Sequence, residues 1–248
     1  MSNGYFEAYI NSRTYRESAN DSLLMTRIVA AVRAHVLGAQ VRWAGSQRKG
    51  TAIANSDLDV IVESSVAVTE AQRRTLRLTM ESSLGRKALI LSHVIRLPAT
   101  NDSPKVDIAF ANAAFGSRQL PSIDAFHNRP ARQMAARALK LWSRAGNKPN
   151  VSGWVAEAVV VHLDQSNNSR APLELFLHIV EWLAERATPE ALEGVLRPAA
   201  SPVWKEEWSR QLPGRIEALK NHARSLLKRA GKRDSWKSVS DVGDWLSQ

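Results

Sequence analysis

The sequence contains no cysteine and no long apolar run. The first absence excludes a disulfide scaffold and every zinc site that depends on thiolate ligands. The second argues against a membrane-spanning helix, which needs about 20 consecutive apolar residues. Residues 1–20 are polar and charged, unlike the apolar stretch of a signal peptide. We therefore expect a protein that is neither secreted nor embedded in a membrane, with a cytoplasmic location.

Acidic residues are fewer than basic residues, with 24 Asp and Glu and 34 Lys and Arg, so the formal net charge is +10. This balance favours phosphates, nucleotides or nucleic acid as partners, although a solvated positive face is an equally ordinary explanation. The six histidines show neither His-Glu-x-x-His spacing nor a Ser/His/Asp order. Nothing therefore indicates a zinc protease or a serine hydrolase.

The chain of 248 residues is long enough for one large domain or two small ones. In the first half, helices are expected at 21–37 and 69–84, and strands at 41–44, 57–63, 88–97 and 105–111. Beyond a stretch without periodicity at 113–129, helices are expected at 131–145, 152–164, 172–187, 189–196 and 209–230. We predict an α+β fold with a small mixed-sheet lobe in residues 1–120 and a helical lobe in residues 121–248.

Three aspartates lie in the expected strands. Asp57 and Asp59 are two residues apart, so in a strand their side chains share one face while the apolar residues beside them take the other. Asp107 lies in a second run of the same kind. Asp is depleted in strands, and clustered carboxylates repel one another unless a cation neutralises them. If the strands are neighbours in register, the three carboxylates form a metal site. The alternative is that Asp57 and Asp59 lie at a solvent-exposed end of a strand and that Asp107 is not part of any site with them.

Gly45 and Ser46 follow the first expected strand and precede the aspartate pair. Glycine lets the backbone approach a phosphate closely, and a helix that starts here offers free N–H groups to an anion. Ser46 would add a hydroxyl hydrogen bond. A lone Gly-Ser pair is usually a turn, so its place between a strand and the aspartates is what makes it informative.

This order of Gly45 and Ser46, then Asp57 and Asp59, then Asp107, resembles the signature of DNA polymerase β-like nucleotidyltransferases. The string GSQRKGTAIANSDLDVIV is most similar to the branch of oligoadenylate synthases, bacterial cyclic-oligonucleotide synthases and archaeal-type CCA-adding enzymes. The resemblance implies that Gly45 and Ser46 hold the triphosphate of an NTP. It also implies that the three aspartates are catalytic and bind two Mg²⁺ ions, or Mn²⁺ in their place.

The second half resembles the same branch at two segments. The run RALKLWS is similar to the family helix whose lysine contacts the triphosphate, which implies this role for Lys140. Ser152 and Trp154 stand where a small hydroxyl and an aromatic lie near the nucleotide; because the family has Tyr where this chain has Trp154, ring packing is expected there. From the residues alone, Lys140 is a solvated helix lysine, Ser152 a helix cap and Glu157 its polar-face neighbour.

The last third carries aromatic and basic residues on one expected helix. Trp204 and Trp208 are one helical turn apart, a spacing that serves base stacking or, more often, core packing. The basic set that follows consists of Arg210, Arg215, Lys220, Arg224, Lys228, Arg229, Lys232 and Arg233. Such a row either follows a nucleic-acid backbone or forms a solvated face.

The resemblance implies transfer of a nucleoside monophosphate from an NTP to a hydroxyl, with release of pyrophosphate. Because the positive charge is strong and widespread, we favour RNA or an oligonucleotide as the acceptor. Two alternatives stay open: a synthase that makes cyclic or linear oligonucleotide signals from NTPs alone, and a non-catalytic nucleic-acid-binding protein on the same fold. The sequence leaves the oligomeric state open.

Overall fold

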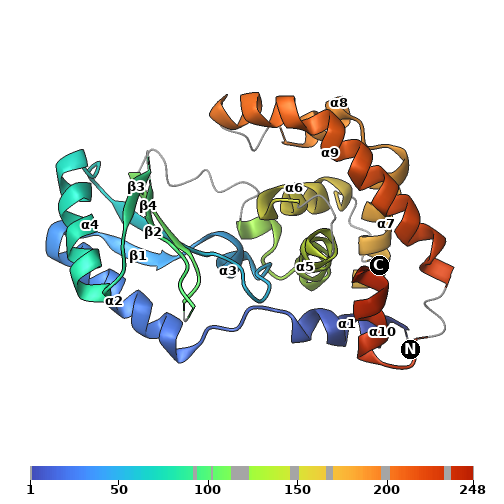
Figure 1. Ribbon diagram of the computed structural model, residues 1–248, viewed down its shortest axis with the longest axis horizontal. Coiled ribbons are helices and arrows are strands. Elements are labelled where there is room, and N and C mark those ends of the chain that lie inside the picture. The colour runs from blue at the N-terminus through green and yellow to red at the C-terminus, as the bar shows by residue number, and fades with distance from the viewer. Residues whose placement is uncertain are drawn as a thin grey trace. The chain divides into compact units, whose positions relative to one another are not determined.

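The computed structural model describes residues 2–91, 94–101, 103–112, 123–145, 151–165, 170–196, 202–231 and 236–247. The chain forms two compact units, whose elements are labelled in Figure 1. The sheet unit spans Tyr15–Gln119, and the helical unit combines Met1–Thr14 with Leu120–Gln248. Each unit has its own hydrophobic core. The α+β class predicted from the sequence is confirmed.

Within the described residues of the sheet unit, five strands form one mixed sheet in the order β1-β2-β5-β4-β3. Their bounds are β1 Gln40–Trp43, β2 Leu58–Ser64, β3 Leu89–Leu91, β4 Val94–Leu97 and β5 Val106–Asn112. Strands β2 and β5 are parallel, whereas β1–β2, β4–β5 and β3–β4 are antiparallel. The two strands expected to carry aspartates are therefore neighbours inside the sheet.

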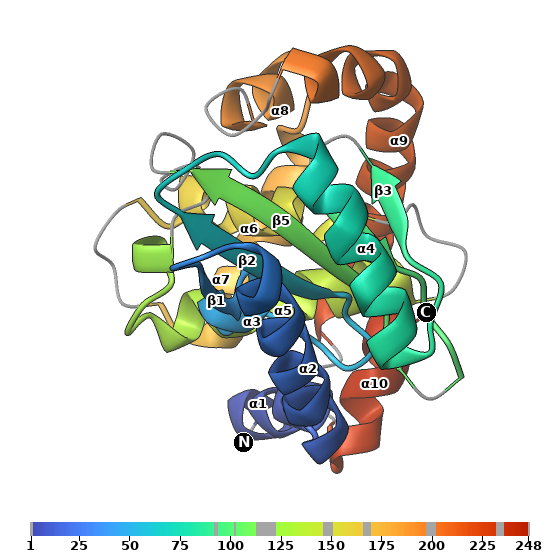
Figure 2. The same cartoon turned by 90° about the vertical axis from the view of Figure 1, so that its left-hand side faces the viewer.

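Helices α2, Ala19–His35, and α4, Glu70–Leu84, lie side by side against one face of this sheet (Figure 2). Strands β2 and β5 each turn alternate apolar side chains toward the helices, so that Val60 and Ile108 are at most 1% exposed. Because side chains alternate along a strand, the residues between them project from the opposite face. The apolar packing on one face thus decides which residues the other face presents.

The helical unit is built around a separate core. Its helices are α1 Ser2–Ser12, α5 Pro130–Arg144, α6 Gly153–Leu163, α7 Pro172–Glu185, α8 Pro189–Leu196, α9 Pro202–Lys228 and α10 Val239–Ser247. Phe6 and Ile10 of α1 are fully buried in this core with Trp142 and Phe176. The first 14 residues therefore belong to the helical unit, which corrects the expected boundary that assigned all of residues 1–120 to the sheet lobe. Among the helices described, none is both long and apolar enough to cross a membrane.

Several elements differ from the expectation. The run expected as one strand at 88–97 forms the antiparallel pair β3 and β4, because its two ends pair with each other. Helices α1 and α10 were not expected, and α9 begins at Pro202 rather than at 209. Helix α2 begins before Asp21 because Ser18 and Asp21 form a capping box, with Asp21 Oδ2 accepting from Ser18 N at 2.9 Å. Of the expected linker at 113–129, residues 113–122 lie outside the described residues, and Ile123–Ala125 forms a 3-10 turn.

Candidate active site

Two aspartates stand opposite each other on the parallel strands β2 and β5. Asp59 is the register partner of Asp107. Their neighbours Leu58 and Val106 are fully buried toward α2 and α4, so both carboxylates project from the other face of the sheet. Asp57 comes one residue before β2, and 54% of its side chain is exposed. The expected strands are thus neighbours in register, which brings two of the three carboxylates together.

Gly45 lies directly against the Asp59 carboxylate. It begins the short helix α3, Gly45–Lys49, which follows β1, and its φ of +55° is in the left-handed region. A Cβ atom at Gly45 would stand 1.9 Å from Asp59 Oδ2, so a side chain has no room here. The backbone is held close by the hydrogen bond from Ala44 N to the Asp59 carbonyl at 2.8 Å. Conformation and space therefore both require glycine.

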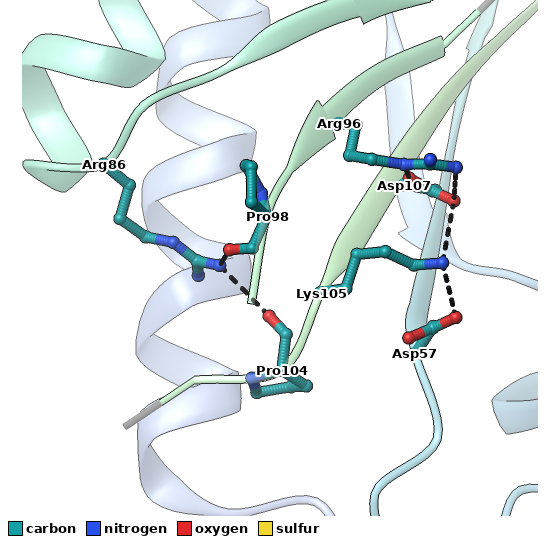
Figure 3. A network of polar contacts seen from close by, with 7 residues as sticks. All are labelled: Asp57, Arg86, Arg96, Pro98, Pro104, Lys105 and Asp107. Carbon is teal, nitrogen blue, oxygen red and sulfur yellow. Dashed lines mark hydrogen bonds and ion pairs between the residues drawn. The ribbon is translucent and has the colours of Figure 1, made fainter. Parts of the chain in front are cut away.

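Two basic side chains neutralise the aspartates (Figure 3). Arg96 is the register partner of Asp107 on β4 and donates from Nε and Nη2 to its two carboxylate oxygens, at 2.7 and 2.9 Å. These hydrogen bonds raise the pKa of the Arg96 guanidinium. Lys105 Nζ lies 2.6 Å from Asp57 Oδ2 and 3.8 Å from Asp107 Oδ2, so it links the remaining carboxylate to the cluster. Neither residue was predicted from the sequence, although Lys105 stands two residues before Asp107 and therefore on the same strand face.

The chemistry of this cluster fits a divalent cation, because carboxylate oxygens are the ligands that Mg²⁺ prefers in proteins. Throughout the described part of the chain, no three His, Cys, Asp or Glu side chains form a group already arranged to hold a metal ion. In this arrangement the carboxylates of Asp57 and Asp107 contact Lys105 and Arg96 instead. The site therefore has suitable oxygen ligands for a metal, and two of its carboxylates, those of Asp57 and Asp107, are paired with Lys105 and Arg96.

Arg86 fixes the connection that leads from β4 into β5. It donates to the carbonyl oxygen of Pro98 and to that of Pro104, at 3.1 Å for the latter (Figure 3). Its Nη1 also donates to Ser103 Oγ at 2.7 Å. Burial lowers the pKa of the Arg86 guanidinium. Because Lys105 directly follows Pro104, these hydrogen bonds hold the backbone from which the Lys105 side chain extends.

The helical unit contains a buried ion pair between α5 and α6. Lys140 Nζ lies 2.8 Å from Glu157 Oε1, and only 2% and 3% of the two side chains are exposed. The interpretations of Lys140 as a solvated helix lysine and of Glu157 as a polar-face residue are therefore wrong. Both side chains point into the interior, where a charge is stable only when it is paired. A Cβ atom at Gly153 would stand 3.3 Å from Lys140 Cε, so the start of α6 closes over the lysine.

Ser152 and Trp154 flank Gly153 at the start of α6. Ser152 occupies the N-cap position, but its side chain makes no capping hydrogen bond, so the cap interpretation holds for its position alone. Its Oγ is buried and has no hydrogen-bond partner in the described structure. Trp154 is partly buried against the helical core. Contacts from Lys140, Ser152 or Trp154 to an NTP stay predictions.

Helix α9 presents basic residues to solvent along the part whose side chains are described. The exposed members of the expected set there are Arg215, Arg224 and Lys228. The Lys220 side chain is 17% exposed, and its Nζ lies 3.4 Å from Glu217 Oε1. The side chains of Trp204, Trp208 and Arg210, and all of Lys232 and Arg233, lie outside what the structure describes. Both interpretations of this basic row therefore remain open.

Comparisons with known proteins identify the fold. No protein-family model and no curated protein matches the chain. A structure of the Cid1 poly(U) polymerase with Mg and 3′-dATP matches with a TM-score of 0.67 at 16% identity, over 100% of this chain and 98% of that one. A chain of the non-canonical poly(A) polymerase complex GLD-2–GLD-3 matches with a TM-score of 0.67 at 12% identity, over 100% and 98%. A cytoplasmic RNA terminal U-transferase matches with a TM-score of 0.59 at 14% identity, over 76% and 71%.

These similarities show that the chain has the fold of the compared polymerases. The α+β fold implied by the resemblance to DNA polymerase β-like nucleotidyltransferases agrees with these matches, and membership of that superfamily stays a prediction. Fold alone does not determine chemistry, which depends on the residues of the site.

Proposed function

We propose that this protein is a metal-dependent nucleotidyltransferase, which moves a nucleoside monophosphate from an NTP to a hydroxyl of RNA or an oligonucleotide and releases pyrophosphate. The observation that carries the proposal is the juxtaposition of Gly45, Asp59 and Asp107 on a polymerase fold. Gly45 leaves no space between the backbone and the Asp59 carboxylate, and Asp59 stands opposite Asp107. Such an arrangement of carboxylates beside a backbone without a side chain suits a site for a metal-bound triphosphate.

In this proposal, Asp57, Asp59 and Asp107 hold two Mg²⁺ ions, or Mn²⁺ in their place. When bound, the ions supply charge neutralisation for the triphosphate and lower the pKa of the attacking hydroxyl. Gly45 and Ser46 bind the triphosphate through backbone N–H groups and the serine hydroxyl. The protein's own contribution is thus mainly positioning and electrostatic stabilisation, as is general for phosphoryl chemistry.

The helical unit is proposed to bind the NTP through Lys140, Ser152 and Trp154. Pairing with Glu157 keeps the Lys140 ammonium in one place, and contact with a phosphate requires that this buried ammonium be uncovered. The partner-free Ser152 Oγ offers a hydroxyl to a ligand. The Trp154 ring offers apolar surface to a ribose or base.

An RNA acceptor is supported by two independent observations. The compared structures are those of an RNA terminal U-transferase, a poly(U) polymerase and a poly(A) polymerase. The chain also carries a net charge of +10, and α9 exposes Arg215, Arg224 and Lys228. Positive charge spread along a helix is what a polymeric phosphate backbone binds.

The first experiment removes one catalytic charge. Asp107→Asn keeps the side-chain volume, and we expect pyrophosphate release with Mg²⁺, NTP and RNA to fall by about a hundredfold to a thousandfold or more. The melting temperature should change little, since Asp107 is only partly buried. Asp244→Asn makes the same chemical change at an exposed position of α10 and serves as the control. Turnover of the Asp107 variant at the wild-type rate would refute the proposal.

The second experiment identifies the acceptor by supplying labelled NTPs and Mg²⁺ with and without mixed RNA. An RNA-extending enzyme needs the RNA, and its RNA affinity falls steeply with salt because each phosphate contact releases counterions. Arg224→Gln with Lys228→Gln should flatten this slope by about one per lost contact, whereas Arg74→Gln with Lys87→Gln, an equal charge loss in the sheet unit, should not. Products from NTPs alone would indicate a signal synthase, and RNA binding without transfer a non-catalytic protein.

A further inference from the structure

Lys105 lies between two carboxylates of the candidate site, where a cation is needed (Figure 3). Its Nζ is 2.6 Å from Asp57 Oδ2 and 3.8 Å from Asp107 Oδ2. We propose that Lys105 is an exchangeable cation, which competes with the divalent metal for these two aspartates and so sets the metal affinity of the site. The inference rests on the proposed function in one respect, because it takes Asp57 and Asp107 to be metal ligands.

Of the two basic residues at the site, Lys105 is the one suited to exchange. Arg96 holds Asp107 with two hydrogen bonds from a planar guanidinium, at 2.7 and 2.9 Å. Lys105 makes one short contact, and its ammonium is a point charge on a flexible stem. Its side chain is 29% exposed and that of Asp57 is 54% exposed. The ammonium can therefore move into water at small cost, because exposed ion pairs contribute little free energy.

Lys105 and a metal ion compete for the same carboxylates. A Mg²⁺ ion requires its ligand oxygens at about 2.0–2.1 Å, and the Lys105 ammonium already lies against Asp57 Oδ2. Two positive charges at such separations also repel each other. In the absence of metal, Lys105 relieves the repulsion between Asp57 and Asp107; on metal binding it must withdraw. Removal of the lysine charge should therefore strengthen metal binding, whereas loss of a purely structural support would weaken it.

The test measures metal binding directly, without NTP and without turnover. Mn²⁺ is titrated into the full-length protein and free Mn²⁺ is followed by electron paramagnetic resonance. For Lys105→Gln we expect the Kd for Mn²⁺ to decrease by about threefold to tenfold, since a nearby like charge is removed. Lys105→Arg keeps the charge and should not tighten binding. Lys87→Gln removes the same charge from an exposed position of the same unit and should leave the Kd unchanged.

The outcomes separate this inference from the proposed activity. Unchanged or weaker Mn²⁺ binding by a folded Lys105→Gln variant overturns the inference, even if the wild-type protein transfers nucleotides. Equal tightening in the Lys87→Gln variant also overturns it, because the effect would then be one of net charge. Tightening confined to Lys105→Gln supports the inference, even if no NMP transfer is found. Asp107→Asn should weaken Mn²⁺ binding in every case where the inference holds.

Discussion

Each unit of the chain pairs a lysine with a carboxylate, and the two pairs differ in burial. In the sheet unit, Lys105 and Asp57 leave 29% and 54% of their side chains exposed. In the helical unit, Lys140 and Glu157 leave 2% and 3%. Water can replace a lost partner in the first pair but not in the second. The same chemical pair is thus suited to exchange in one unit and to fixed positioning in the other.

The largest expected effect comes from breaking the buried pair. Glu157→Leu leaves the Lys140 ammonium in the interior without its counter-charge, and we expect the free energy of unfolding to fall by about 3–5 kcal/mol. The double variant Lys140→Met with Glu157→Leu removes both charges and should recover most of this loss. Urea denaturation of the three proteins measures the difference. A single variant as stable as the wild type would contradict the assignment of a fixed, buried pair.

The double variant also tests the predicted NTP contact. If Lys140 binds the triphosphate, its replacement should weaken NTP affinity by about 1.5–3 kcal/mol, the cost of a charge-assisted hydrogen bond. Isothermal titration with a non-hydrolysable NTP and Mg²⁺ measures this affinity in a protein that still folds. Unchanged affinity would leave the Lys140–Glu157 pair with a structural role alone.

An intermediate effect is expected for a substitution of Gly45, because the backbone there packs closely against the Asp59 carboxylate. An alanine there would have a left-handed φ and a Cβ atom 1.9 Å from Asp59 Oδ2. Gly45→Ala should cost about 1–3 kcal/mol of stability and displace the Asp59 carboxylate, so transfer activity should fall as well. Gly85→Ala is the matched control, because Gly85 has φ +61° and nothing within 4 Å of the added Cβ. Equal losses of stability and activity in both variants would argue against a special contact with Asp59.

The smallest effect on stability is expected for Lys105→Gln. Because Asp57 is exposed and Lys105 is partly exposed, the free energy of unfolding should change by no more than about 1 kcal/mol. The same urea experiment gives this value beside that for Glu157→Leu. A loss as large as that of the buried pair would show that Lys105 is a fixed structural element, and the contrast between the two units would disappear.

Much of the sheet unit could be predicted because its signals are local. Alternation of Asp57 and Asp59 with apolar residues predicted a strand with one charged face, and β2 has Leu58 and Val60 buried on the other face. The division of residues 88–97 into β3 and β4 could not be predicted in this way, since an alternating run does not reveal whether it continues or pairs with itself. The sequence also did not predict that α1 belongs to the helical unit, because the residues that bury Phe6 lie far from it in the sequence.

The sequence by itself determined which residues of each strand share a face, and that glycine precedes the aspartates, because these are properties of neighbours in the chain. Only the tertiary structure decided that Asp59 stands opposite Asp107, that Gly45 touches Asp59, and that Arg96 and Lys105 neutralise the cluster. It also decided that Lys140 is buried against Glu157 rather than solvated. Strand register and helix burial depend on the segments that pack together, and a residue's own neighbours in sequence do not specify them.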